Sequence, residues 1–143
     1  MAYRVRTGLL ALAVAFSAGI HAGLVPEHLK EMPQLGYAFM FASLVGAALA
    51  VTLIWRPDER RIWMLAGFFC LGQIAAWGLF VTVRVPFFSG TPEPVEAIAL
   101  VSKAIEAFGV VIALSLIASG HARSVPAPRR HHRPAWRERA SAR

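Results

Sequence analysis

Four long apolar stretches, each about the length of a membrane-spanning helix, dominate this sequence. They cover residues 7–25, 35–55, 62–83 and 95–119. A helix needs about 20 apolar residues to cross the roughly 30 Å of bilayer hydrocarbon, and in hydrocarbon the backbone must satisfy its own hydrogen bonds. The stretches lack the two-residue alternation of barrel strands. The sequence therefore predicts an all-α membrane protein, a four-transmembrane-helix bundle.

Short segments that combine proline with charged residues separate the stretches. They read PEHLKEMPQ, RPDERR and RVPFFSGTPEP, and such segments are typical of turns and helix ends. The composition agrees, because 57% of the 143 residues are hydrophobic and only 16% are charged. We expect residues 1–119 to form one transmembrane domain, with no second, soluble domain.

The distribution of basic residues predicts the orientation. Arginines occur at the N-terminus, in the second connecting segment and above all after residue 120, whereas the first and third segments contain only Lys30 and Arg84. Basic residues concentrate on the cytoplasmic side of membrane proteins. Both termini are therefore predicted to be cytoplasmic, in a multi-pass protein of the plasma membrane. Alternatively, Arg4, Arg6 and the following run to FSAGIHAG form a cleaved signal peptide, which would leave three spans.

The tail, residues 120–143, is rich in arginine and proline and has few aliphatic residues. This composition predicts a disordered basic cytoplasmic tail. Beside a membrane, arginine clusters bind anionic lipid headgroups, so the bilayer and these headgroups are the expected partners. Nucleic acid is not expected.

Small residues recur every four positions on the first two stretches, which favours close helix packing in lipid. These ridges are Ala11, Ala15, Gly19 and Gly23, and Ala42, Gly46 and Ala50. For the ridges, packing within one bundle is favoured over dimer formation. A homo-oligomer or a larger membrane complex is possible. His21 lies on another face of its helix and should point to a different neighbour or a cavity.

Ionisable residues within apolar spans are costly and indicate a functional site. Lys103 and Glu106 lie three residues apart and can neutralise each other, and they share a helix face with Glu96. The alternative is an outward-side pocket that binds a small ligand. Its candidate residues are His21, Arg84, Glu96, Lys103, Glu106, Gln73 and Trp77.

Two ligand classes suit these residues. His21, His28 and Glu31 are residue types that bind zinc, copper or iron. A quinone or a lipid headgroup is the alternative. Arg84 would then bind an anionic or carbonyl oxygen of the ligand, and His21 or Glu106 would exchange protons with it. The cofactor, if the protein has one, is not specified by the sequence.

Several short motifs resemble a group of four-span membrane proteins of high-GC bacteria that has no established activity. They are His21, PEHLKE at 26–31 with Gly36, Trp77 with Arg84 and Pro86, Glu93 with Pro94, and Glu106. The VGLP-like pattern of that group reads VRVPFF here. The resemblance implies the same topology and site residues, and no function.

No complete catalytic set can be assembled from these residues. We therefore expect a non-enzymatic accessory subunit or binding module with a polar pocket near the outer face. The alternative is a membrane oxidoreductase, or a metal- or quinone-binding protein, that uses the His, Glu and Arg cluster.

Overall fold

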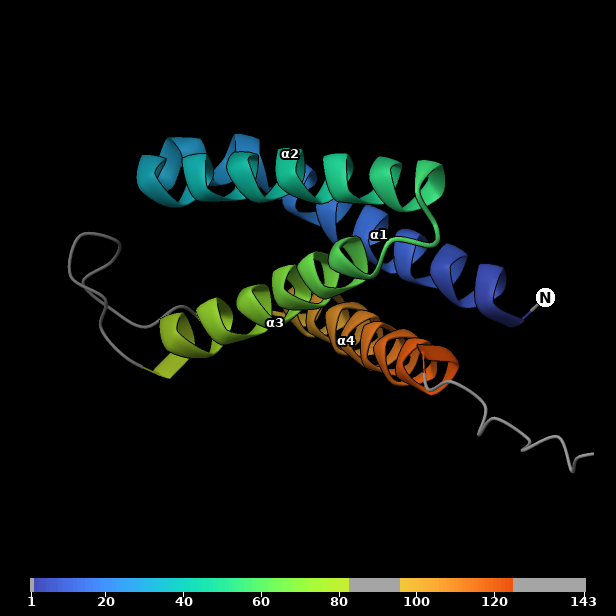
Figure 1. Cartoon of the computed structure of the whole chain (residues 1–143). Coiled ribbons are helices and arrows are strands. Elements are labelled where there is room, and N and C mark those ends of the chain that lie inside the picture. The colour runs from blue at the N-terminus through green and yellow to red at the C-terminus, as the bar shows by residue number, and fades with distance from the viewer. Residues whose placement is uncertain (1, 83–95, 125–143) are drawn as a thin grey trace, which may run out of the picture.

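The computed structural model describes residues 2–82 and 96–124, with the side chains of 3–82 and 96–119. This part of the chain is all-helical, and its four helices are α1 (Ala2–Glu31), α2 (Pro33–Trp55), α3 (Arg60–Thr82) and α4 (Ala97–Ser124) (Figure 1). Each is long and apolar enough to cross a membrane. The predicted all-α fold with four membrane-length helices is confirmed.

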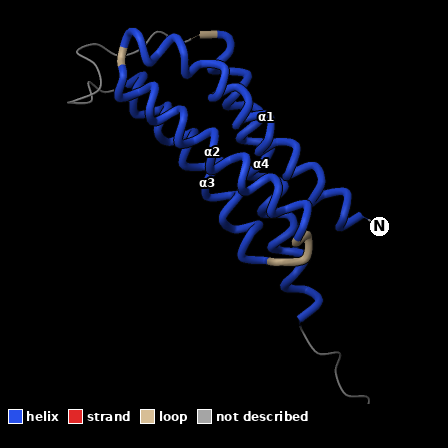
Figure 2. Tube along the Cα trace, turned by 90° about the horizontal axis from the view of Figure 1, so that it is seen from above, coloured by secondary structure: helices blue, strands red, loops and turns tan. Residues whose placement is uncertain are grey.

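The helices form two antiparallel pairs, α1 with α2 and α3 with α4, and contacts between α1 and α4 join the pairs. Figure 2 shows the four helices running alongside one another. In Figure 1 the pairs converge near the α2–α3 connection and diverge toward the start of α2 and the end of α3. The bundle is therefore closed at one end and splayed at the other.

The closed end holds the apolar core, and it also holds the start of α1 and the later part of α4. Arg6 Nη1 donates to Ser119 Oγ at 2.9 Å. The Pro57 carbonyl in the α2–α3 connection accepts hydrogen bonds from Tyr3 Oη and from Trp63 Nε1. The buried core at this end comprises Leu10, Ala11, Val14, Ala50, Leu53, Trp63, Ala66, Cys70, Ala113 and Leu116.

The turn between α1 and α2 is tighter than the sequence suggested. The first span was predicted to end at Val25, before Pro26, but α1 continues through Pro26 to Glu31 and only Met32 separates it from α2. Proline removes a single backbone donor, and the helix continues beyond it. The apolar span of α4 ends at Ser119, as predicted, and the helix itself continues to Ser124.

Gly36 allows this tight turn. A Cβ atom on Gly36 would lie 2.7 Å from the main-chain nitrogen of Leu29. The absence of a side chain therefore lets the first turns of α2 pack directly on the last turns of α1.

The two small-residue ridges differ in their use. Ala42, Gly46 and Ala50 are buried, and a Cβ on Gly46 would lie 2.8 Å from Ala18 Cβ, so the predicted packing role of this ridge is confirmed. Of the four ridge residues on α1, only Ala11 is buried. Ala15, Gly19 and Gly23 are exposed, and a Cβ on either glycine would meet nothing within 4 Å. The predicted intramolecular role of the first ridge is wrong beyond Ala11, because α1 turns a neighbouring face, with Val14 and His21, into the bundle.

The outer surfaces of the helices are apolar. Large exposed hydrophobic side chains occur on each helix, among them Phe16, Phe41, Phe68 and Val111. Such a surface suits lipid rather than water. Arg84 and residues 125–143, which include most of the predicted basic tail, lie outside the described residues.

Candidate functional site

A fully buried carboxylate lies at the point where α1 meets α4. Glu106 is 0% exposed, and its Oε1 atom accepts hydrogen bonds from Ser17 Oγ on α1 at 2.8 Å and from Ser102 Oγ on α4 at 3.0 Å. Ser102 lies one helical turn before Glu106, so α4 supplies both groups on one face. Hydroxyl donors to an ionised carboxylate form strong hydrogen bonds.

The second carboxylate oxygen is held by an ammonium group. Lys103 Nζ lies 2.6 Å from Glu106 Oε2 and also donates to the main-chain carbonyl of Gln73 on α3 at 3.2 Å. The predicted Lys103 and Glu106 pair is therefore present and faces the bundle interior. Its contacts connect α1, α3 and α4, and the opposite charges neutralise each other in a place where a lone charge would be costly.

His21 lies one turn beyond Ser17 on α1, and its side chain is buried. Its Nδ1 atom lies 2.8 Å from the Ser17 main-chain carbonyl oxygen. A carbonyl can only accept, so Nδ1 carries the proton of this hydrogen bond, and Nε2 of the neutral ring keeps a lone pair. The ring packs edge-on against Phe39 of α2, with 5.3 Å between centroids.

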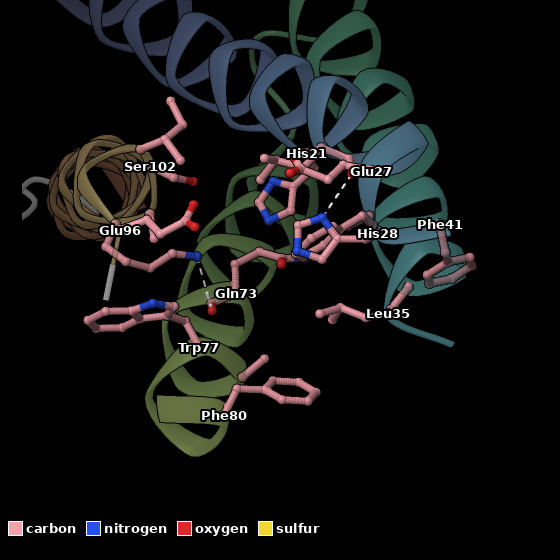
Figure 3. A pocket seen from close by; sticks show the side chains of 18 of the residues that line it. His21, Glu27, His28, Leu35, Phe41, Gln73, Trp77, Phe80, Glu96 and Ser102 are labelled. Carbon is pink, nitrogen blue, oxygen red and sulfur yellow. Dashed lines mark hydrogen bonds between the residues drawn. The ribbon is translucent and has the colours of Figure 1, made fainter. Parts of the chain in front are cut away.

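Above this cluster, the splayed end of the bundle encloses a cavity of about 380 Å³. His21, Ser102 and Lys103 form its floor, so that Glu106 lies directly beneath it. Figure 3 shows the His21 ring facing the space between the helices, opposite Gln73 and Trp77. Apolar walls come from all four helices and include Leu24, Leu35, Phe39, Trp77, Phe80 and Ile98.

Acidic residues surround the mouth of the cavity. Glu27 and Glu31 belong to the last two turns of α1, and Glu96 precedes α4; all three side chains are exposed. His28, between the two α1 carboxylates, binds the Leu24 main-chain carbonyl through Nδ1 at 2.9 Å. Its ring contacts Phe39 from the side of the mouth, at 4.7 Å between centroids.

The structure brings together the described residues that the sequence singled out. His21, His28, Glu31, Gln73, Trp77, Glu96 and Lys103 line one cavity, and Glu106 lies beneath its floor. Arg84 lies outside the described residues. The order of depth could not be read from the sequence: Glu106 and His21 are deep, whereas Glu31 and Glu96 are at the rim.

Sequence reasoning missed Ser17, Ser102, Phe39 and Glu27. The two serines had a usable signal, because each lies four residues from a predicted site residue, Ser17 from His21 and Ser102 from Glu106. Residues four apart are neighbours on a helix face. Phe39 gave no such signal, since it reaches the histidines only through the tight turn between α1 and α2.

The metal-ligand candidates are not gathered into a metal site. Among residues 2–82 and 96–124, no three His, Cys, Asp or Glu side chains are placed so that they could hold a metal ion. His21 and His28 instead direct Nδ1 to main-chain carbonyls of their own helix.

No protein-family model, curated protein or solved structure matches this chain. The resemblance to four-span proteins of high-GC bacteria therefore stays a prediction.

Proposed function

We propose that this protein is a multi-pass plasma-membrane protein with cytoplasmic termini, and that it binds a small amphipathic molecule in the cavity at its outward end. It acts as a binding module and not as an enzyme. The apolar outer surface and the four membrane-length helices support the membrane location. The arginine distribution supports the orientation, because it assigns the end that holds the termini to the cytoplasm.

The observation that carries the proposal is the cavity above Glu106. Its volume of about 380 Å³ is within the range of small-ligand sites, roughly 300–1,000 Å³. It combines aromatic and aliphatic walls with a few polar groups at the floor and the mouth, as ligand sites usually do. Lys103 and Glu106 are paired with each other, so neither group of the pair is free to act in a reaction.

Filling the cavity tests this proposal. Ala76 lines the cavity on α3, whereas the neighbouring Ala75, which is exposed like Ala76, does not line it. We expect that Ala76→Trp abolishes binding of small aromatic probes to protein in lipid nanodiscs, because the indole occupies the space. Ala75→Trp is the matched control and should bind the probes like the unmodified protein.

Suitable probes are phenethylamine, propylbenzene and 3-phenylpropionate, which differ in charge but share one phenyl group. Binding is measured by equilibrium dialysis against empty nanodiscs of phosphatidylcholine. If none of the three probes binds above the empty-nanodisc level, or if Ala76→Trp binds them unchanged, the proposed function is wrong.

A further inference from the structure

The charges around the cavity are strongly unequal. Three carboxylates, Glu27, Glu31 and Glu96, line the described part of its wall, against one ammonium group, that of Lys103. This ammonium group is already paired with a fourth carboxylate, Glu106, at 2.6 Å. A ligand that enters the cavity therefore meets a surplus of negative charge on the part of the wall that the structure describes.

The floor of the cavity also offers a hydrogen-bond acceptor, on His21. His21 is 4% exposed and uses Nδ1 to bind the Ser17 carbonyl. Its Nε2 lone pair has no hydrogen-bond partner among the residues that the structure describes. Because Nε2 is an acceptor, the His21 ring offers no donor to an anionic group at the floor of the cavity.

The walls between floor and mouth add aromatic surface. Phe39 and Trp77 are half-buried and line the cavity from α2 and α3. Aromatic faces attract organic cations as well as apolar groups, and tryptophan does so most strongly. Such walls accommodate an apolar body with a positively charged end.

We propose that the ligand is a small organic cation, an alkyl or arylalkyl ammonium compound, whose charged group lies among Glu27, Glu31 and Glu96 at the mouth. Its apolar body packs between Phe39 and Trp77. This inference rests on the proposed binding function and adds the charge of the ligand. It disfavours a quinone or an anionic headgroup, because the one cation on the described walls is engaged by Glu106.

The three probes introduced above test the charge preference directly. Phenethylamine is the cation, propylbenzene replaces its ammonium group by a methyl group, and 3-phenylpropionate is an anion. We expect phenethylamine to bind at least about tenfold more tightly than propylbenzene, since three carboxylates each contribute modestly near a surface. The anion should bind most weakly, because the mouth repels it.

Removing the acidic charges supplies the second readout. The triple variant Glu27→Gln, Glu31→Gln, Glu96→Gln should lose about tenfold in phenethylamine affinity and leave propylbenzene affinity unchanged. Glu59→Gln, at the opposite end of the bundle, is the matched control and should have no effect on either probe.

The outcomes separate this inference from the proposed function. If propylbenzene or 3-phenylpropionate binds as tightly as phenethylamine, and Ala76→Trp still removes that binding, the cavity is a ligand site and the cation preference is wrong. The same conclusion follows if the triple variant binds phenethylamine unchanged. If no probe binds, the proposed function fails together with this inference.

Discussion

The Ser17 hydroxyl on α1 donates a hydrogen bond of 2.8 Å to Glu106 Oε1 on α4, 89 residues later in the chain, and both side chains are fully buried. This contact joins the two helix pairs at the level where the bundle begins to splay. Toward the closed end lies the apolar core, and toward the open end lies the cavity. The pair therefore marks the boundary between the part that stabilises the bundle and the part that binds.

The charge pair should make Glu106 critical for stability. Glu106→Gln leaves the Lys103 ammonium group without its counter-charge in a nearly dry environment, and we expect the free energy of unfolding to fall by about 3 kcal/mol. The double variant Lys103→Met, Glu106→Gln should recover more than half of this loss, because no lone charge remains. Equilibrium unfolding in mixed detergent micelles measures both. A double variant less stable than Glu106→Gln alone would contradict this account.

The hydrogen bond between the pairs can be removed by itself. Ser17→Ala takes one of the two hydroxyl donors from Glu106, and we expect a loss of about 1 kcal/mol, typical of a polar contact between membrane helices. Ser43→Ala is the control, since that hydroxyl bonds only to the Phe39 carbonyl of its own helix. Equal effects of the two substitutions in the same unfolding assay would show that the Ser17 contact does not join the helices.

The tight turn between α1 and α2 depends on Gly36. Gly36→Ala forces a Cβ to within 2.7 Å of the Leu29 backbone, which must shift, and we expect a destabilisation of about 1–3 kcal/mol. A Cβ on Gly72 of α3 meets nothing within 4 Å, so Gly72→Ala should be neutral or slightly stabilising. Thermal unfolding in detergent compares the two variants. A Gly36→Ala protein as stable as Gly72→Ala would show that the helices are not packed as closely as described.

The orientation has its own test. A phosphatase reporter that folds only outside the cytoplasm should be inactive when fused after Arg143 and active when inserted at Met32, between α1 and α2. The reason is that basic residues cluster at the end of the bundle that holds the termini. The opposite pattern of activity would place the cavity at the cytoplasmic side.

The number and type of the helices could be predicted because length and hydropathy alone determine them. The sequence was a poorer guide to where the helices end: Pro26 suggested a break, yet α1 passes through it to Glu31. The sequence also did not indicate which face of α1 packs inside the bundle. Gly19 and Ala15 looked suited to a helix contact, but the rotation of α1 in the bundle is set by Val14, Ser17 and His21 together with their partners on other helices.

The site was predictable at the level of residue types. Ionisable residues in apolar spans are rare, so His21, Lys103 and Glu106 stood out, and the structure places them together. Ser17 and Ser102 each lie four residues from a predicted site residue, but a serine hydroxyl often bonds to its own helix, as Ser43 does. The spacing alone therefore did not show that Ser17 donates to Glu106 on α4.

Cysteine accessibility tests most directly whether an open cavity leads from the outer face toward Glu106. A thiol reacts with a maleimide as the thiolate, which requires water. We predict that Ala76→Cys, in the cavity wall, reacts with a membrane-impermeant maleimide added outside intact cells, whereas Ala75→Cys on the same helix turn does not. The unmodified protein, whose Cys70 is buried, gives the background. Equal labelling of the two variants, or labelling of Ala75→Cys alone, would contradict the outward-facing cavity.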